Sequence, residues 1–185
     1  MSPVTASLIQ LVPFSELAEG EAASIRNRLI EKLVALASRE LSMAPEKLVV
    51  RDIRAKEDLA LYSAGADADV EDWGCVTGSS PNAYETMATG SMATNRYMGF
   101  FGVKCAVDAF ACTALKINTG EADRAIWQLE CLKPEDGMVG FSPGGVIIPQ
   151  NSAYTISRYV RKASSAAYIL LKGIIVEPRG RVVSP

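Results

Sequence analysis

The fold is decided by residues 153–178, AYTISRYVRKASSAAYILLKGIIVEP, which hold two strand patterns separated by a short polar segment. Residues 153–160 alternate between apolar and polar types, which is typical of a strand with one buried face. Residues 166–178 are apolar at most consecutive positions, and a strand of this kind is expected to be covered on both faces. We therefore place residues 166–178 at the centre of a β-sandwich.

Further strand patterns precede this pair and are separated by turn signals. RYMGFFGVKCAV (96–107) is apolar, and CTALKIN (112–118) is linked to RAIWQLECL (124–132) by a connection of hairpin length. SPGG (142–145) has the composition of a type II turn. About seven short strands with no helical pattern between them predict a mainly β protein, an antiparallel β-sandwich, with a jelly roll as the candidate topology.

One amphipathic α-helix is predicted before the strands, over residues 21–44. Ile25, Leu29, Leu33 and Leu36 recur at spacings of four, four and three, which places them on one helical face. This stripe requires a cover, either the protein's own sandwich or a neighbouring copy. We expect a neighbouring copy, because the two sheets of a sandwich can cover each other without the helix.

The chain of 185 residues is long enough for one domain with a substantial core. Residues 1–20 mix apolar residues with two prolines and predict an extended N-terminal arm, which packs on its own domain or on a neighbour. Residues 46–185 form the predicted sandwich domain. Within it, residues 63–95 show no sustained periodicity and are rich in Gly, Ser, Thr, Ala and Asp, so a long loop is expected there.

Composition excludes several classes of function. The absence of histidine removes the usual general base and the commonest nitrogen ligand of transition metals, and with them the Ser-His-Asp, Cys-His and histidine-based zinc sites. A net charge of −2 gives no overall attraction to nucleic acid or to anionic membranes. The four cysteines lack metal-site or redox spacing, so reduced thiols in a protein core are expected.

Three groups of residues are candidates for chemical sites. Asp67, Asp69, Glu71 and Asp72 carry oxygen donors for calcium, but the glycine and glutamate of an EF-hand are missing, so a solvated acidic loop is the favoured interpretation. The glycine-rich segments match no phosphate-binding motif. Glu85, Glu130 and Glu177 are the carboxylates left for hydrolysis without histidine, and no catalytic residue, cofactor or metal ligand is assigned.

A group of basic and aromatic residues lies at the end of the strand predicted over residues 153–160. Arg158, Tyr159 and Arg161 are residue types that are enriched in protein interfaces and also bind single-stranded nucleic acid or glycans. Because the chain is net negative, we favour a protein interface over nucleic-acid binding. The predicted subunit interface therefore comprises this group and the helical stripe.

Residues 144–160 and 166–180, GGVIIPQNSAYTISRYV and AAYILLKGIIVEPRG, resemble the closing strands of single-domain β-sandwich proteins from phage and archaeal virions. The resemblance covers roughly residues 96–180 and is one of pattern. It implies a self-assembling capsid, cement or tail component, located in the virion or otherwise in the cytoplasm, since no signal peptide or membrane span is recognised. The alternatives are a carbohydrate- or small-ligand-binding module, with Trp73 and Tyr84 as contacts, and an enzyme using carboxylates or a metal.

Overall fold

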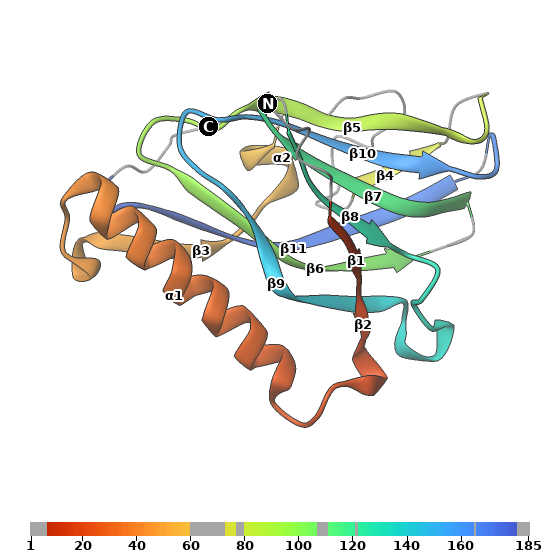
Figure 1. Ribbon diagram of the computed structural model, residues 1–185, viewed down its shortest axis with the longest axis horizontal. Coiled ribbons are helices and arrows are strands. Elements are labelled where there is room, and N and C mark those ends of the chain that lie inside the picture. The colour runs from red at the N-terminus through yellow and green to blue at the C-terminus, as the bar shows by residue number, and fades with distance from the viewer. Residues whose placement is uncertain are drawn as a thin grey trace.

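The computed structural model describes residues 7–59, 73–76, 80–106, 111–120, 122–164 and 166–180. Two β-sheets pack face to face, and a long helix lies against one of them (Figure 1). The helices are α1 (Glu21–Leu41) and α2 (Ala55–Asp58), with short 3-10 turns η1 (Phe14–Glu16), η2 (Pro45–Lys47) and η4 (Pro134–Asp136). The strands are β1 (Ser7–Gln10), β2 (Val12–Pro13), β3 (Leu48–Asp52), β4 (Trp73–Val76), β5 (Ala83–Ser91), β6 (Tyr97–Ala106), β7 (Cys112–Thr119), β8 (Ala122–Gln128), β9 (Val139–Ile148), β10 (Ala153–Val160) and β11 (Ala166–Pro178).

The strand order is that of a jelly roll. Sheet A has the order β1-β8-β7-β10-β5, sheet B has the order β2-β9-β6-β11-β3, and β4 also pairs with β11. If β1, β2 and β4 are set aside, the remaining eight strands pair first with last (β3 with β11), second with seventh (β5 with β10), third with sixth (β6 with β9) and fourth with fifth (β7 with β8). This nesting of two Greek keys is the jelly-roll arrangement. The expected mainly β sandwich with an N-terminal helix is confirmed.

Strand β11 lies in the interior of sheet B, as its apolar pattern predicts. It pairs with β6 on one side and with β3 and β4 on the other. Leu171 and Ile175 point into the core between the sheets, whereas Ile174 and Val176 point toward the helix. Both faces are therefore covered, which explains why apolar residues occupy consecutive positions.

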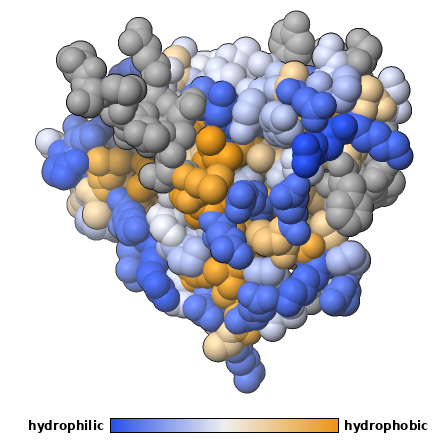
Figure 2. All heavy atoms as spheres, turned by 45° about the vertical axis from the view of Figure 1, so that its right-hand side comes forward, coloured by the Kyte–Doolittle hydropathy of each residue, from blue (hydrophilic) through white to orange (hydrophobic). Residues whose placement is uncertain are grey.

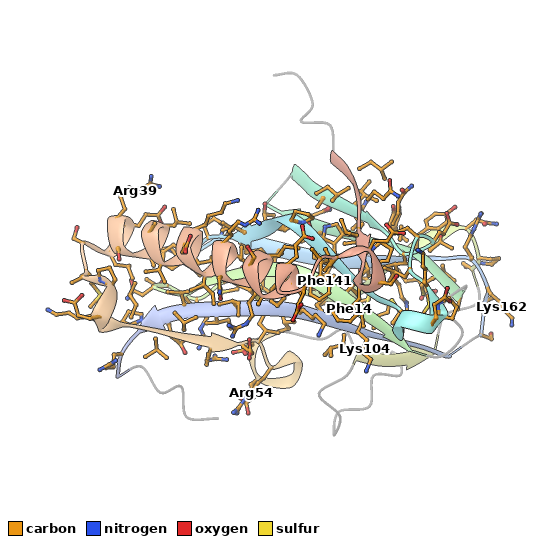
Figure 3. The ribbon with its side chains drawn as sticks, turned by 90° about the horizontal axis from the view of Figure 1, so that it is seen from below. Phe14, Arg39, Arg54, Lys104, Phe141 and Lys162 are labelled. Carbon is orange, nitrogen blue, oxygen red and sulfur yellow. The ribbon has the colours of Figure 1, made fainter. Side chains whose placement is uncertain are left out.

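The helical stripe is covered by the protein's own sheet, so the expectation of a neighbouring copy is wrong. Ile25, Leu29 and Leu33 are 2%, 3% and 0% exposed, and they pack with Ala37 on the outer face of sheet B. Leu36 is half-buried at the margin of the same cluster. The expectation failed because sheet B is apolar on both faces. Sheet A covers its inner face, and the helix is needed to cover its outer face. Figure 3 shows α1 lying along this sheet.

The described part of the N-terminal arm, residues 7–20, packs on its own domain. Strand β1 runs parallel to β8 at the edge of sheet A, and after one residue β2 pairs antiparallel with β9 at the edge of sheet B. Leu11, between them, is 1% exposed and lies in the core between the sheets. The arm therefore crosses from one sheet to the other. The strand pairs other than β1 and β8 run antiparallel within the described ranges.

Two strands, β4 and β5, lie within residues 63–95, so the prediction of one long loop there is wrong. Strand β5 has the sequence AYETMATGS, whose small and polar residues carry little apolar periodicity. It forms because it pairs along its length with β10, and a bulge there leaves the adjacent residues Met87 and Ala88 both buried. Sequence periodicity missed this strand because one residue is inserted where the alternation would have continued.

The SPGG segment does not reverse the chain, contrary to the turn prediction. Residues 142–145 form an irregular stretch within β9, where Phe100 pairs with Val146 and Gly102 pairs with Phe141. Gly145 has a φ of 63°, and a Cβ on it would lie 3.0 Å from Leu29 of α1 and 3.1 Å from the carbonyl oxygen of Phe100. Glycine at this position therefore allows the helix to approach the sheet closely.

Candidate functional site

The outer face of sheet A is the candidate functional surface, because no helix of the described ranges covers it (Figure 1). Leu115, Trp127 and Ile156 point into the core, so their sequence neighbours point outward. The outward side chains are Leu8 and Gln10 on β1, Ile126 and Gln128 on β8, Ala114, Lys116 and Asn118 on β7, Thr155, Ser157 and Tyr159 on β10, and Tyr84, Thr86, Thr89 and Ser91 on β5.

The side chains that the structure describes on this surface are almost all uncharged. Among the strand side chains that the structure describes on it, Lys116 carries the single charge, and the others are hydroxyl, amide, tyrosine or aliphatic groups. Leu8 is 63% exposed and Tyr84 is 40% exposed, which makes them the main apolar contact groups. Figure 2 shows that hydrophobic side chains also reach the surface among hydrophilic ones in the view that it presents.

An aromatic cluster lies on the β5 side of this surface. The rings of Tyr84 and Tyr159 meet edge to face with their centroids 5.1 Å apart, and Lys116 Nζ lies 4.4 Å from the centroid of Tyr84. Further along the same strand pair, beyond Thr86 and Ser157, the hydroxyls of Thr89 and Thr155 are 3.2 Å apart. Edge-to-face rings and a cation over a ring are both favourable contacts, so the cluster holds its side chains in a defined arrangement.

Arg158 does not belong to a surface interface, which corrects the sequence prediction. It points inward from β10, is 4% exposed, and its Nη2 donates to Glu85 Oε2 of β5 at 3.0 Å. Burial lowers the pKa of the Arg158 guanidinium. Tyr159 lies on the outer face as a half-buried residue, and Arg161 is exposed beyond the strand end. Neighbouring residues of one basic group thus occupy different environments because a strand alternates its faces.

A second buried ion cluster joins α2, β3, β11 and the residue before β6. Arg51 donates from Nη1 and Nη2 to the two oxygens of Asp58 at 2.6 Å each, and from Nε to Glu177 at 3.1 Å. Arg96 donates from Nε to Glu177 at 2.9 Å. The carboxylates raise the pKa of Arg51, with its hydrogen bond to Asp58 as the largest contribution. The side chains of Asp58 and Glu177 are 1% and 9% exposed, so the cluster is buried and links these segments within the fold.

The sequence did not predict this ion cluster. Its members are separated by up to 126 positions along the chain, and no local spacing marks them. The one available signal was the presence of charged residues within otherwise apolar strand patterns, such as Glu177 near the end of β11.

The carboxylates considered for hydrolysis do not form a pair. Glu85 is bound by Arg158 within sheet A, and Glu177 is bound by Arg51 and Arg96 in sheet B. Glu130 is exposed in the turn after β8. Two carboxylates that act together on one substrate need to face a common cleft, and these three lie on different elements.

The cysteines described by the structure are unpaired thiols. Cys105 and Cys112 belong to the core between the sheets, and burial raises the pKa of each to about 12. Cys131 is half-buried, and its Sγ donates to the carbonyl oxygens of Leu11 and Gln128. Burial also raises the pKa of Cys131. Protonated thiols are weak nucleophiles, so these groups serve packing.

Some sequence candidates lie outside the described residues. The calcium candidates Asp67, Asp69, Glu71 and Asp72 are among them, and so is the side chain of Trp73. In the ranges that the structure does describe, no group of three or more metal-ligating side chains is found. No described helix is long and apolar enough to cross a membrane.

Comparison with known proteins assigns no family to the chain. No protein-family model matches it, and no curated protein has a matching sequence. The surfaces and side-chain clusters of the structure therefore provide the evidence on function.

Proposed function

We propose that the protein is a structural subunit that assembles with copies of itself, and that the outer face of sheet A is its contact surface. The observation that carries this proposal is the difference between the two sheets. Helix α1 covers the apolar outer face of sheet B, whereas no described helix covers the outer face of sheet A, on which Lys116 carries the single charge among the described strand side chains.

The chemistry of this surface suits contact with an identical surface. In a two-fold contact, residue i of one copy meets residue j of the other and j meets i, so a face with charges of mainly one sign would repel its copy. Hydroxyl and amide groups such as Thr86, Ser91 and Gln128 both donate and accept hydrogen bonds, and tyrosines such as Tyr84 are enriched in protein interfaces. A neutral face of this kind meets its copy without an electrostatic penalty.

The face approaches the size of a typical interface. Strand β1 has four residues and the other four strands have seven to nine, so at about 3.3 Å per residue and about 4.8 Å between strands the face covers roughly 570 Å². A typical stable interface buries roughly 800 Å² per partner, so this face with its margins approaches the required area. The exposed Leu8 at the β1 edge extends the apolar part of the contact.

The virion role is the finer part of the proposal, as a capsid, cement or tail component. Its support is the jelly-roll topology, which capsid proteins use and which lectin domains and cupins share. A fold of this kind hosts several functions, so the topology favours the role by likeness alone. The ion clusters fit a structural role, because Arg51, Arg96 and Arg158 each hold carboxylates within the domain.

Light scattering after size-exclusion chromatography tests self-assembly. We expect the unmodified protein to form oligomers at about 100 µM, a concentration at which even weak contacts are occupied. Thr86→Lys places an extra charge on the exposed outer face and should shift the protein toward the monomer. Ala35→Lys, at an exposed position of α1, is the matched control and should leave assembly unchanged.

The outcomes separate the two parts of the proposal. A monomeric unmodified protein would contradict self-assembly. Oligomers that respond equally to both lysine substitutions would keep self-assembly but exclude this face as the contact. Electron microscopy of the assembled protein tests the virion role: closed particles or tubes, in which a further contact joins the two-fold pairs, are expected, and a dimer alone would contradict it.

Carbohydrate binding is the second candidate, favoured by the cluster of Tyr84, Tyr159 and Lys116, next to which Thr86 pairs with Ser157 along the same two strands. Aromatic faces next to hydrogen-bonding groups are suited to sugar rings. Calorimetric titration with oligosaccharides distinguishes it from assembly. Saturable binding by a monomer, lost in Tyr84→Ala, would favour this candidate.

A further inference from the structure

A groove beside the N-terminal half of α1 is unrelated to the face proposed for assembly. It has a volume of about 410 Å³ and lies between the first turns of the helix and the outer face of sheet B. This volume is near the lower end of the roughly 300–1,000 Å³ that small-molecule sites occupy. The groove is therefore large enough for part of a small ligand.

The floor of the groove is apolar and aromatic. Phe101 and Phe141 lie there with ring centroids 6.3 Å apart and an interplanar angle of 25°. Ile53 of the segment after β3 and Leu170 of β11 extend the apolar lining. The ring centroid of Phe14, which is 54% exposed, lies 6.2 Å from that of Phe141. Figure 3 shows these two side chains near one end of the helix. An apolar chain or ring is the ligand part that this floor would take.

The charged lining is net positive. Arg26 of α1 and Asp52 of β3 form an ion pair at 3.0 Å, so their charges offset each other. Lys172 lies beyond this pair on β11, on the side of the sheet that faces the helix. Within the described ranges, no carboxylate forms an ion pair with Lys172. Its ammonium group is the uncompensated charge of the groove.

We propose that this groove binds a single-chain amphiphile with a carboxylate head, whose apolar chain lies over Phe101 and Phe141 and whose head pairs with Lys172. The reason is complementarity: an apolar floor with one unpaired cation at its side matches an apolar body that ends in one anion. A cationic amphiphile would meet the same floor but would be repelled by Lys172. A neutral one would leave the ammonium group unpaired.

Calorimetric titration with dodecanoate, below its micelle concentration, tests the proposal on the full chain. We expect saturable binding of one dodecanoate per chain and none of dodecyltrimethylammonium. Lys172→Gln should weaken binding about tenfold, which corresponds to the loss of about 1.4 kcal/mol from one charged contact. Lys104→Gln is the matched control, since Lys104 is exposed on the neighbouring strand β6 and does not line the groove.

A second pair of variants tests the location without removing a charge. Ala23 lines the groove and is exposed, so Ala23→Trp should fill the groove and abolish binding. Ala35→Trp, at an exposed position of the same helix outside the groove, should bind as the unmodified protein does. Absence of saturable dodecanoate binding would overturn the proposal. So would equal binding of the cationic amphiphile, an equal effect of Lys172→Gln and Lys104→Gln, or full binding by Ala23→Trp.

Discussion

Asp58 illustrates how single residues are tied into the fold. Its two oxygens accept two hydrogen bonds from Arg51 and one at 2.8 Å from the backbone N–H of Arg54, while its side chain is 1% exposed. Removal of one member of a buried ion cluster leaves the opposite charges without a partner. Such a substitution therefore destabilises the protein by more than the ion pair itself stabilises it.

Asp58→Ala should lower the free energy of unfolding by about 1.5–3 kcal/mol, because the partly buried Arg51 would lose its two hydrogen bonds to Asp58 and keep only its contact with Glu177. Urea denaturation measures this change. Glu57→Ala is the matched control, since Glu57 is the preceding residue and pairs with Arg54 at an exposed site. Its effect should lie within about 0.5 kcal/mol. Similar losses in both variants would show that the buried cluster contributes little.

The buried thiols predict a loss of stability in alkali. Burial raises the pKa of Cys105 and Cys112 from 9.0 to about 12, so both stay protonated in the folded protein when the unfolded chain ionises. The contribution of the two thiols to the free energy of unfolding is complete below pH 9 and decreases as the pH rises from 9 toward 12. At about pH 10.5 the expected loss is about 1 kcal/mol or more per thiol.

Urea unfolding at about pH 8 and about pH 10.5 measures this effect. The double variant Cys105→Ala, Cys112→Ala controls for the other groups that titrate in alkali, and its stability should change less between the two pH values. Equal changes in the variant and in the unmodified protein would contradict a contribution from these thiols.

At the scale of elements, α1 is an integral part of the domain. Its buried residues Ile25, Leu29, Leu33 and Ala37 lie on Tyr97, Phe101, Phe141, Ile174 and Val176 of sheet B. Polar contacts support the same docking, since Tyr97 donates from its hydroxyl to Glu40 at 2.8 Å and Arg26 pairs with Asp52. The helix and the sheet therefore stabilise each other, and neither apolar face is left in water.

Leu33→Ala should reduce the free energy of unfolding by about 2–5 kcal/mol, as is usual for a leucine in a packed core. Leu36→Ala is the matched control at a half-buried position of the same helix, and its effect should be smaller. Leu29→Asp with Leu33→Asp should abolish the folded β circular-dichroism signal, because the charges would enter an apolar contact. A double variant that keeps its β signal and cooperative melting would show that the domain does not need the helix.

At the scale of the whole molecule, three layers share two cores. One core lies between the sheets and the other lies between sheet B and α1, so sheet B belongs to both. Residues 7–13 tie the edges of the two sheets together. Loss of one layer would expose the apolar face of the next, and we expect the domain to unfold as one unit.

Thermal unfolding of a Trp73→Phe variant checks this cooperativity. Trp127 then remains as the single tryptophan, and it is 0% exposed in the core between the sheets. Its fluorescence and the far-UV circular dichroism of the helix should give the same melting temperature. A helix transition that precedes the fluorescence change would mean that α1 detaches before the sandwich unfolds.

The sequence by itself determined the local structure of the molecule. Alternation over residues 153–160, the apolar run over 166–178 and the spacing of Ile25, Leu29 and Leu33 predicted β10, β11 and α1 correctly, because each pattern follows from the geometry of one element. The sandwich class followed from the number of such strands. Strand β5 was missed because its residues are small and a bulge interrupts its alternation.

Tertiary structure decided the environment of each residue. Whether the leucines of α1 face a sheet or a neighbour depends on whether sheet B is apolar on its outer face, and that depends on the order of β9, β6 and β11. The inward orientation of Arg158 toward Glu85 depends on the register between β10 and β5. Arg51 meets Asp58 and Glu177 because distant segments pair, and contacts between such segments carry no local pattern in a single sequence.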